Sequence, residues 1–292
     1  MKVLATFPGK YGDSLWAMPT LRALSEGIGE PVDLLMTPKY DQLLPLYRQQ
    51  PYIGRAEAWP TWQIQEVGPS PMTPWSPFEH TLHHEALGIR AAEYDHVVHL
   101  GYRTWPPLSL PHYVYQIAQR EYPTVPLAPL DLERPWIADP GGQNFSPFLV
   151  ICGWTDEHFE LKVGLNRLLD RTLDLDVLVP EGSRWATEGW PADRTRATWV
   201  ETARAIAQCQ LFVGDCSALH VLAVALGRPC VIMEPSLARH NPIFWPLGTT
   251  GRVHLVLGND GRPTFDARAV AQAIQAALQR TSTTSTSTRT GT

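Results

Sequence analysis

The stretch VLATFPGKYGDSLWAMPTLRAL, residues 3–24, decides the fold class of this chain. Its apolar beginning, residues 3–7, predicts a buried strand, and Gly9 and Gly12 mark a loop after it. A helical pattern follows, and residues 32–36 (VDLLM) then predict a second strand. The order strand, glycine loop, helix, strand is typical of the start of a parallel α/β sheet.

The helical pattern within this stretch rests on apolar residues at three-residue steps, Leu15, Met18, Leu21 and Leu24. Asp13 and Ser14 stand where helix N-caps are common. Pro19 lies inside the pattern, so we expect the helix to kink there or to start late.

The rest of the chain continues the α/β rhythm in two halves. The first half adds a predicted strand at 96–100 and a predicted helix at 112–121, and residues 59–78, rich in Pro and Trp, are interpreted as an inserted loop. The second half has predicted strands at 148–152, 176–179, 211–213 and 230–233, and predicted helices at 161–173, 198–208, 217–226 and 266–279.

These elements predict two Rossmann-like domains that face each other across a cleft. Prolines and glycines accumulate over residues 123–147, where we place the linker between the domains. The predicted domains are residues 1–140 and 141–280. Residues 281–292 are nearly all Thr and Ser, with nothing to bury, so we expect a disordered tail.

The composition is that of a globular protein without a targeting or membrane segment. The chain has 292 residues, of which 44% are hydrophobic and 18% are charged. A net charge of -5 provides no broad basic field for nucleic acid, although a local basic groove stays open. No apolar run is long enough for a membrane helix, and the first one stops at Pro8, too early for a signal peptide. Four cysteines without CxxC spacing indicate reduced thiols, so we expect a cytoplasmic protein.

Two loops between a strand and a helix carry the most promising chemistry. Ligands of parallel α/β sheets bind at such loops, beyond the carboxyl ends of the strands. Free N–H groups in the loop 214–218 (GDCSA) could bind a pyrophosphate, with Ser217 as a further donor; plain helix capping by Asp215 and Ser217 is the equal alternative. Asp13, in the loop after the first strand, is a candidate general base or again a cap. Lys10 nearby is either a ligand or a solvated cation.

Two segments resemble the heptosyltransferases, glycosyltransferase family 9. Residues 12–24 (GDSLWAMPTLRAL) resemble the Gly-Asp and Pro-x-Leu-x-x-Leu elements that open that family. Residues 212–220 (FVGDCSALH), with the following Ala-rich helix and Gly227-Arg228-Pro229, resemble its Gly-x-Asp-Ser/Thr-Gly-x-x-His segment, with one residue added. A further departure is Phe7, which stands where the family usually has Lys or Arg; Lys10 is a candidate replacement.

The resemblance implies a GT-B fold, an inverting transfer and neither metal nor cofactor. It implies that Asp13 takes the acceptor hydroxyl proton. Lys10 and Gly12 in the same loop, and Arg103 and His112 after a predicted strand of the first domain, are the candidates for contacts on the acceptor side. The implied donor site is the set Gly153, Thr155, Lys162, Glu181, Gly214, Asp215, Cys216, Ser217, Ala218 and His220. Within this set Thr155 and Lys162 would hold phosphates and Glu181 the base or ribose, while His220 either faces the phosphates or packs in its helix.

We therefore expect a glycosyltransferase that moves a sugar from a nucleotide-diphosphate-sugar to the hydroxyl of a glycan, a lipid-linked molecule or another acceptor. Three alternatives stay open at this point. They are a nucleotide-sugar epimerase, a non-catalytic nucleotide-sugar-binding protein, and a transferase acting on a modified nucleic-acid base. The sequence leaves the sugar, the nucleotide, the acceptor and the oligomeric state open.

Overall fold

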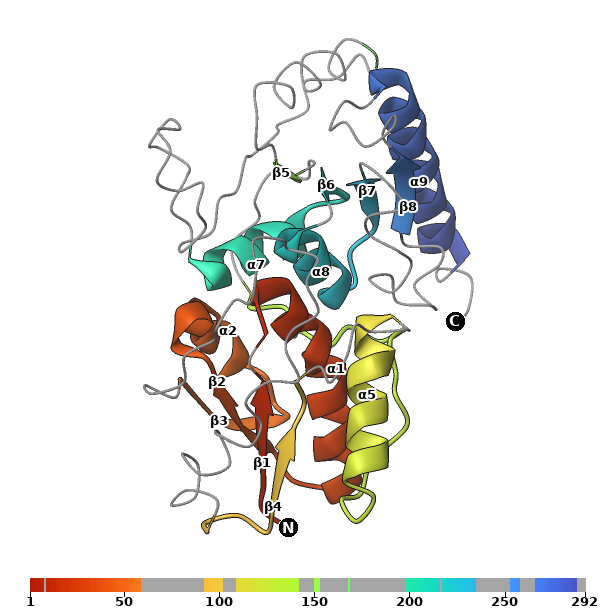
Figure 1. Cartoon of the computed structure of the whole chain (residues 1–292). Helices are drawn as coiled ribbons and strands as arrows, with labels where there is room; N and C mark the ends of the chain where they lie inside the picture. Colours follow the sequence, from red (N-terminus) through yellow and green to blue (C-terminus); the bar gives the residue numbers. More distant parts are fainter. Residues whose placement is uncertain are drawn as a thin grey trace. The chain divides into compact units, whose positions relative to one another are not determined.

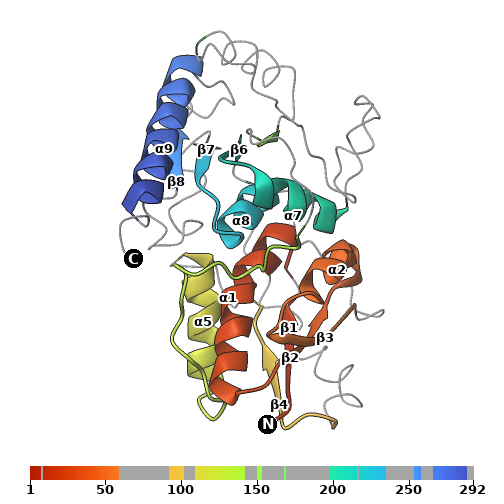
Figure 2. The same cartoon turned by 180° about the vertical axis from the view of Figure 1, so that it is seen from behind.

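The protein consists of two compact units, each built on its own sheet, of which the described residues form four strands (Figures 1 and 2). The computed structural model describes residues 1–7, 9–58, 92–101, 109–141, 150–152, 168, 198–215, 217–234, 253–257 and 266–287. The first unit covers Met1–Ala138, and the second covers the described residues from Asp139 onward. The predicted inserted loop and the predicted elements at 161–173 and 176–179 lie outside the described residues, apart from Leu168.

The first sheet is parallel and has the strand order β3-β2-β1-β4. The strands are β1 (Val3–Phe7), β2 (Val32–Met36), β3 (Ile53–Ala58) and β4 (His96–His99). The strands predicted at 3–7, 32–36 and 96–100 are thereby confirmed. β3 escaped prediction because its sequence IGRAEA carries charges and is only partly buried.

Two long helices of the first unit, α1 (Tyr11–Ile28) and α5 (Leu110–Glu121), lie side by side (Figures 1 and 2). The short helices η1 (Pro38–Leu43) and α2 (Leu44–Tyr47) follow β2. α1 has Lys10 as its N-cap, and the Ser14 N–H donates to the Lys10 carbonyl at 2.8 Å. Asp13 and Ser14 therefore lie inside the first turn, and the expectation that they cap the helix is wrong.

Pro19 neither stops α1 nor delays its start. A proline has no N–H, so the helix cannot supply the usual donor to the carbonyl four residues earlier, at Leu15. The indole Nε1–H of Trp136 donates to this carbonyl instead, at 3.1 Å. A contact across the unit therefore compensates for the proline, which local sequence could not reveal.

Residues 125–138, which we call the strap, lie against the first unit. The Ala128 N–H donates to the Ala23 carbonyl at 2.9 Å, and at Gly27 a Cβ atom would lie 2.5 Å from the Pro126 carbonyl oxygen. The Ala138 N–H donates to Gln50 Oε1 at 2.7 Å. The division of the chain falls after Ala138, inside the linker predicted at 123–147, and the part of that linker before it belongs to the first unit.

The second sheet is also parallel, with the order β5-β6-β7-β8. Its strands are β5 (Val150–Cys152), β6 (Phe212–Asp215), β7 (Cys230–Glu234) and β8 (Val253–Leu257). The helices α7 (Trp199–Gln208) and α8 (Ala218–Ala225) confirm two predicted helices, whereas β8 was not predicted. The helix α9 (Ala267–Ser287) runs past residue 281 into the tail that we expected to be disordered. Extending a helix costs less than starting one, which explains why it continues into Thr and Ser residues.

α9 covers one face of the second sheet. Its buried side chains Val270, Ala271, Ile274 and Ala277 form a cluster with Leu211 and with residues of β6 and β7 that alternate along the strands, Val213, Val231 and Met233. The two described thiol side chains, Cys209 and Cys230, are buried, and burial raises the pKa of Cys230. None of the helices in the described part of the chain is long and apolar enough to cross a bilayer.

Candidate functional site

The first candidate site lies where β1 leads into α1. β1 ends at Phe7, and Gly9 and Lys10 connect it to the first turn of the helix, which contains Asp13. The Asp13 side chain is half-buried. A carboxylate in the first turn lies at the positive end of the helix dipole, which favours its charged form. The structure thus brings together Lys10, Gly12 and Asp13, three of the predicted site residues.

Gly9 fixes the distance between β1 and this first turn. A Cβ atom at Gly9 would lie 2.0 Å from Phe7 Cε1 and 2.8 Å from Asp13 Cβ. No side chain larger than hydrogen fits there without moving the buried Phe7 ring or the Asp13 backbone. Gly9 was recognised from the sequence only as a loop residue.

We expect Gly9→Ala to displace the Asp13 turn and to destabilise the first unit. Overpacking of this kind costs about 1–3 kcal/mol of unfolding free energy, because the Phe7 ring is enclosed. Chemical denaturation of the whole chain measures the loss. Lys10→Ala, in the same loop, adds no atoms and should stay within about 0.5 kcal/mol of the parent. Equal stability of Gly9→Ala and the parent would contradict the close approach.

Tyrosine side chains hold the start of α1 in place. The Tyr11 hydroxyl donates to Gln42 Oε1 at 2.6 Å, and the Tyr11 ring meets the Tyr40 ring edge-on at 4.8 Å between centroids. The Tyr47 hydroxyl donates to Ser14 Oγ at 2.7 Å, and burial raises the pKa of Tyr47, so the hydroxyl keeps its proton. Asp13 therefore sits on a turn that η1 and α2 support. Sequence reasoning missed these supports because they join residues about thirty positions apart.

A second strand end lies beside the first. β4 pairs with β1, so the carboxyl ends of both strands reach the same edge of the sheet. Thr6 Oγ1 and His99 Nδ1 share a buried hydrogen bond of 2.7 Å, and the His99 N–H donates to the Tyr122 hydroxyl oxygen at 3.0 Å. The chain runs from β1 to β2 on one side and returns to β4 on the other, so this edge is the topological switch point at which α/β sheets bind ligands.

α5 begins after β4 and carries His112 in its first turn. Ser109 is the N-cap, and its Oγ shares a short hydrogen bond with His112 Nδ1. Burial lowers the pKa of His112, so the imidazole is neutral at pH 7. The first turns of two neighbouring helices thus carry a carboxylate and a neutral imidazole, and His112 joins the residues of this unit that sequence reasoning selected.

In the second unit the candidate site is the β6–α8 turn. Gly214 pairs with Cys152 of β5 and Ile232 of β7, so the turn follows a central strand. Ser217 is the N-cap of α8, and its N–H donates to His220 Nδ1 at 2.8 Å. His220 is 2% exposed. Because Nδ1 accepts, the neutral ring carries its proton on Nε2. The structure therefore favours the packed position of His220 at the helix start.

Several known structures similar to this chain span nearly its whole length. The Escherichia coli heptosyltransferase WaaC, solved with ADP-2-deoxy-2-fluoro heptose, aligns with 94% of this chain and 99% of its own, at 15% identity and a TM-score of 0.61. The E. coli ADP-heptose LPS heptosyltransferase II aligns over 97% and 100%, at 15% identity and a TM-score of 0.60. A family 9 glycosyl transferase from Veillonella parvula aligns over 96% of both chains, at 14% identity and a TM-score of 0.58.

The chain has the GT-B fold. No protein-family model and no curated protein matches the sequence. The fold expected from the two sequence segments is therefore confirmed by structure, where whole-sequence comparison finds nothing.

Some of the remaining predicted site residues lie together at one turn, and the others lie outside the described residues. Gly214, Ser217, Ala218 and His220 meet at one βα turn of the second unit, together with the backbone of Asp215. The predicted residues Arg103, Gly153, Thr155, Lys162, Glu181 and Cys216 lie outside the described residues. The described residues thus provide separate candidate sites, the β6–α8 turn in the second unit and, in the first unit, the β1–α1 turn and the start of α5.

Proposed function

We propose that this GT-B chain is a glycosyltransferase that moves a sugar from a nucleotide-diphosphate-sugar to an acceptor hydroxyl. The observation that carries the proposal is the full-length likeness in fold to three sugar transferases, one of them solved with an ADP-sugar. Support comes from the βα turns, because each unit presents a helix start beyond a central or switch-point strand.

In the proposed reaction Asp13 is the general base. The acceptor hydroxyl oxygen attacks the anomeric carbon of the sugar, and the bond from that carbon to the diphosphate oxygen breaks. The electron pair leaves on the diphosphate, and the hydroxyl proton passes to the Asp13 carboxylate. Direct displacement inverts the anomeric centre. Lys10, Gly12, Arg103 and His112 are the residues proposed to contact the acceptor.

The proposed donor site uses the start of α8 in place of a metal. The N–H groups of Ala218 and Leu219 and the helix dipole stabilise the charge that develops on the diphosphate. The Ser217 N–H is already bonded to His220, so His220 shapes this turn and leaves the later amides for phosphate. Gly153, Thr155, Lys162, Glu181, Gly214, Asp215 and Cys216 complete the proposed donor site.

A thermal-shift series with ADP-, UDP-, GDP- and CDP-sugars tests donor binding. A donor at 100 times its dissociation constant should add about 2.7 kcal/mol to the unfolding free energy. Ala218→Pro should weaken this gain, since proline is tolerated at the first position of a helix but has no N–H for a phosphate. Ala267→Pro makes the same change at the first residue of α9 and should bind the donor like the parent.

Two outcomes would count against the donor site. One is a chain that none of the four nucleotide sugars stabilises. The other is an Ala218→Pro variant that binds the donor as well as Ala267→Pro does. With donor binding established, release of the nucleotide in the presence of candidate acceptors then measures the transfer itself.

A further inference from the structure

The Trp136 indole supplies the hydrogen bond that Pro19 removes from α1. Leu15 lies in the turn directly after Asp13, and its carbonyl would normally accept from the N–H of residue 19. Trp136 Nε1–H occupies that role at 3.1 Å, in a contact between residues 121 positions apart. Trp136 and Leu15 are both buried, so no water replaces the indole. A buried carbonyl left without a donor would be costly.

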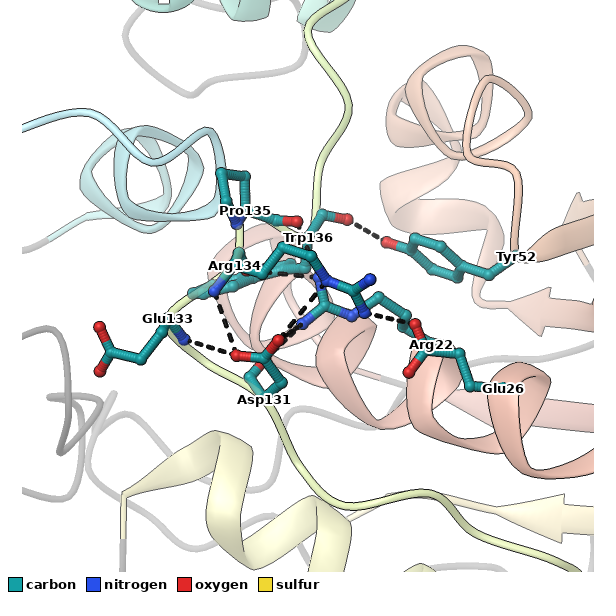
Figure 3. A network of polar contacts seen from close by, with 8 residues as sticks. All are labelled: Arg22, Glu26, Tyr52, Asp131, Glu133, Arg134, Pro135 and Trp136. Atoms are coloured by element: carbon teal, nitrogen blue, oxygen red, sulfur yellow. Dashed lines mark hydrogen bonds and ion pairs between the residues drawn. The ribbon is translucent and has the colours of Figure 1, made fainter. Parts of the chain in front are cut away.

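Trp136 is itself held on three sides within the first unit. Its carbonyl accepts from the Tyr52 hydroxyl (Figure 3). Its ring centroid lies 5.7 Å from that of Trp16. The carbonyl of the preceding residue, Pro135, accepts from Arg22 Nη1 at 2.7 Å. The indole is therefore fixed by Tyr52, which directly precedes β3, by Trp16 of α1, and by the strap through Pro135.

We propose that Trp136 is a positioning residue for Asp13. By holding the Leu15 carbonyl, the indole fixes the second turn of α1, on which the Asp13 turn is built. The role of Asp13 rests on the function proposed above, whereas the hydrogen bond and its effect on the helix do not. Trp136 has no part in the proposed chemistry itself.

Trp136→Phe keeps an aromatic ring and removes the N–H. We expect kcat to fall about tenfold, because small displacements of a catalytic group cost that much or more, while KM for the donor changes less than about twofold. We also expect the folding equilibrium constant to fall about tenfold, the usual effect of an orphaned buried carbonyl. Amide exchange at Ser14, whose N–H bonds to Lys10, should become faster.

Pro19→Ala provides the decisive second change, because alanine restores an N–H at position 19. In this background the Leu15 carbonyl has its own helical donor. When Trp136→Phe is added to this background, kcat, the folding equilibrium constant and the protection of the Ser14 amide should each fall by less than about threefold. Because the same substitution causes larger losses in the parent, the two substitutions are strongly coupled. Tyr115→Phe, which removes a 2.9 Å hydrogen bond to the strap carbonyl of Ala128, is the matched control and should show no coupling to Pro19→Ala.

The outcomes separate this proposal from the proposed function. Equal losses for Trp136→Phe in the parent and in the Pro19→Ala background would overturn the role of the hydrogen bond, whether or not the chain transfers sugar. Coupling in stability and Ser14 exchange but not in kcat of an active enzyme would overturn the positioning of Asp13. If the parent transfers no sugar, coupling in the first two readouts still supports the link from Trp136 to the Asp13 turn and the failure belongs to the proposed function.

Discussion

Asp13→Asn should strongly slow sugar transfer and leave donor binding intact. Asparagine has nearly the same shape as aspartate but cannot take the acceptor proton, so kcat should fall about 10²–10⁴-fold, the usual contribution of a general base. The thermal shift with the nucleotide sugar should match that of the parent, because the proposed donor contacts lie in the second unit. Initial rates of nucleotide release at saturating donor measure the loss.

Glu93→Gln is the matched control for this prediction. It makes the same change from carboxylate to amide in the first unit, but at an exposed residue before β4, at the opposite edge of the sheet. Its kcat should equal that of the parent. Full activity in Asp13→Asn would remove Asp13 from the chemistry, and a parent that binds donor without transferring it would favour a non-catalytic binding protein.

Arg22→Met should cause the largest loss of stability in the first unit. The Arg22 side chain is 7% exposed, and its guanidinium donates to the strap carbonyls of Asp131, Arg134 and Pro135 (Figure 3). Burial lowers the pKa of Arg22 from its ordinary value, with the nearby Arg134 acting in the same direction. Methionine fills similar space but donates nothing, so three carbonyls lose their donor and unfolding free energy should fall by about 3 kcal/mol.

Arg134→Met is the comparison within the same network. Arg134 pairs with Glu26 and, at 3.5 Å, with Asp131, but its side chain is 54% exposed, so its loss should cost less than about 1 kcal/mol. Arg22→Lys should fall between the two, because one ammonium cannot reach the carbonyls that the planar guanidinium spans. Urea unfolding of the three variants gives the order, and similar losses for Arg22→Met and Arg134→Met would contradict it.

Local pattern predicted much of the fold because the parallel strands of this chain are short apolar runs. The runs at 3–7 and 230–233 became β1 and β7, and the three-residue spacing from Leu15 became α1. The strap did not follow from local pattern, since its prolines favour an open linker. It is fixed by Arg22, Trp136 and Gln50, whose partners lie far away along the chain.

The candidate site residues could be predicted from local sequence, whereas the residues that support them could not. Asp13, His112 and the 214–218 turn were found because a strand followed by a polar helix start is visible in sequence. Their supports were not, since Tyr47 is opposite Ser14 and His99 opposite Thr6 only once the sheet has formed. Lys10, and not Asp13, is the N-cap of α1, and the hydrogen bond from Tyr11 to Gln42 holds this earlier helix start in place.

The strap also sets the order in which the first unit matures on the ribosome. The described strands of its sheet are all synthesised before residue 100, yet the partners of Arg22 and Leu15 come 109 to 121 positions after them. Until Trp136 has been synthesised, the Arg22 guanidinium and the Leu15 carbonyl of α1 lack the strap groups that they bond in the folded unit. The described part of the first unit therefore gains these contacts only from its last stretch, the strap.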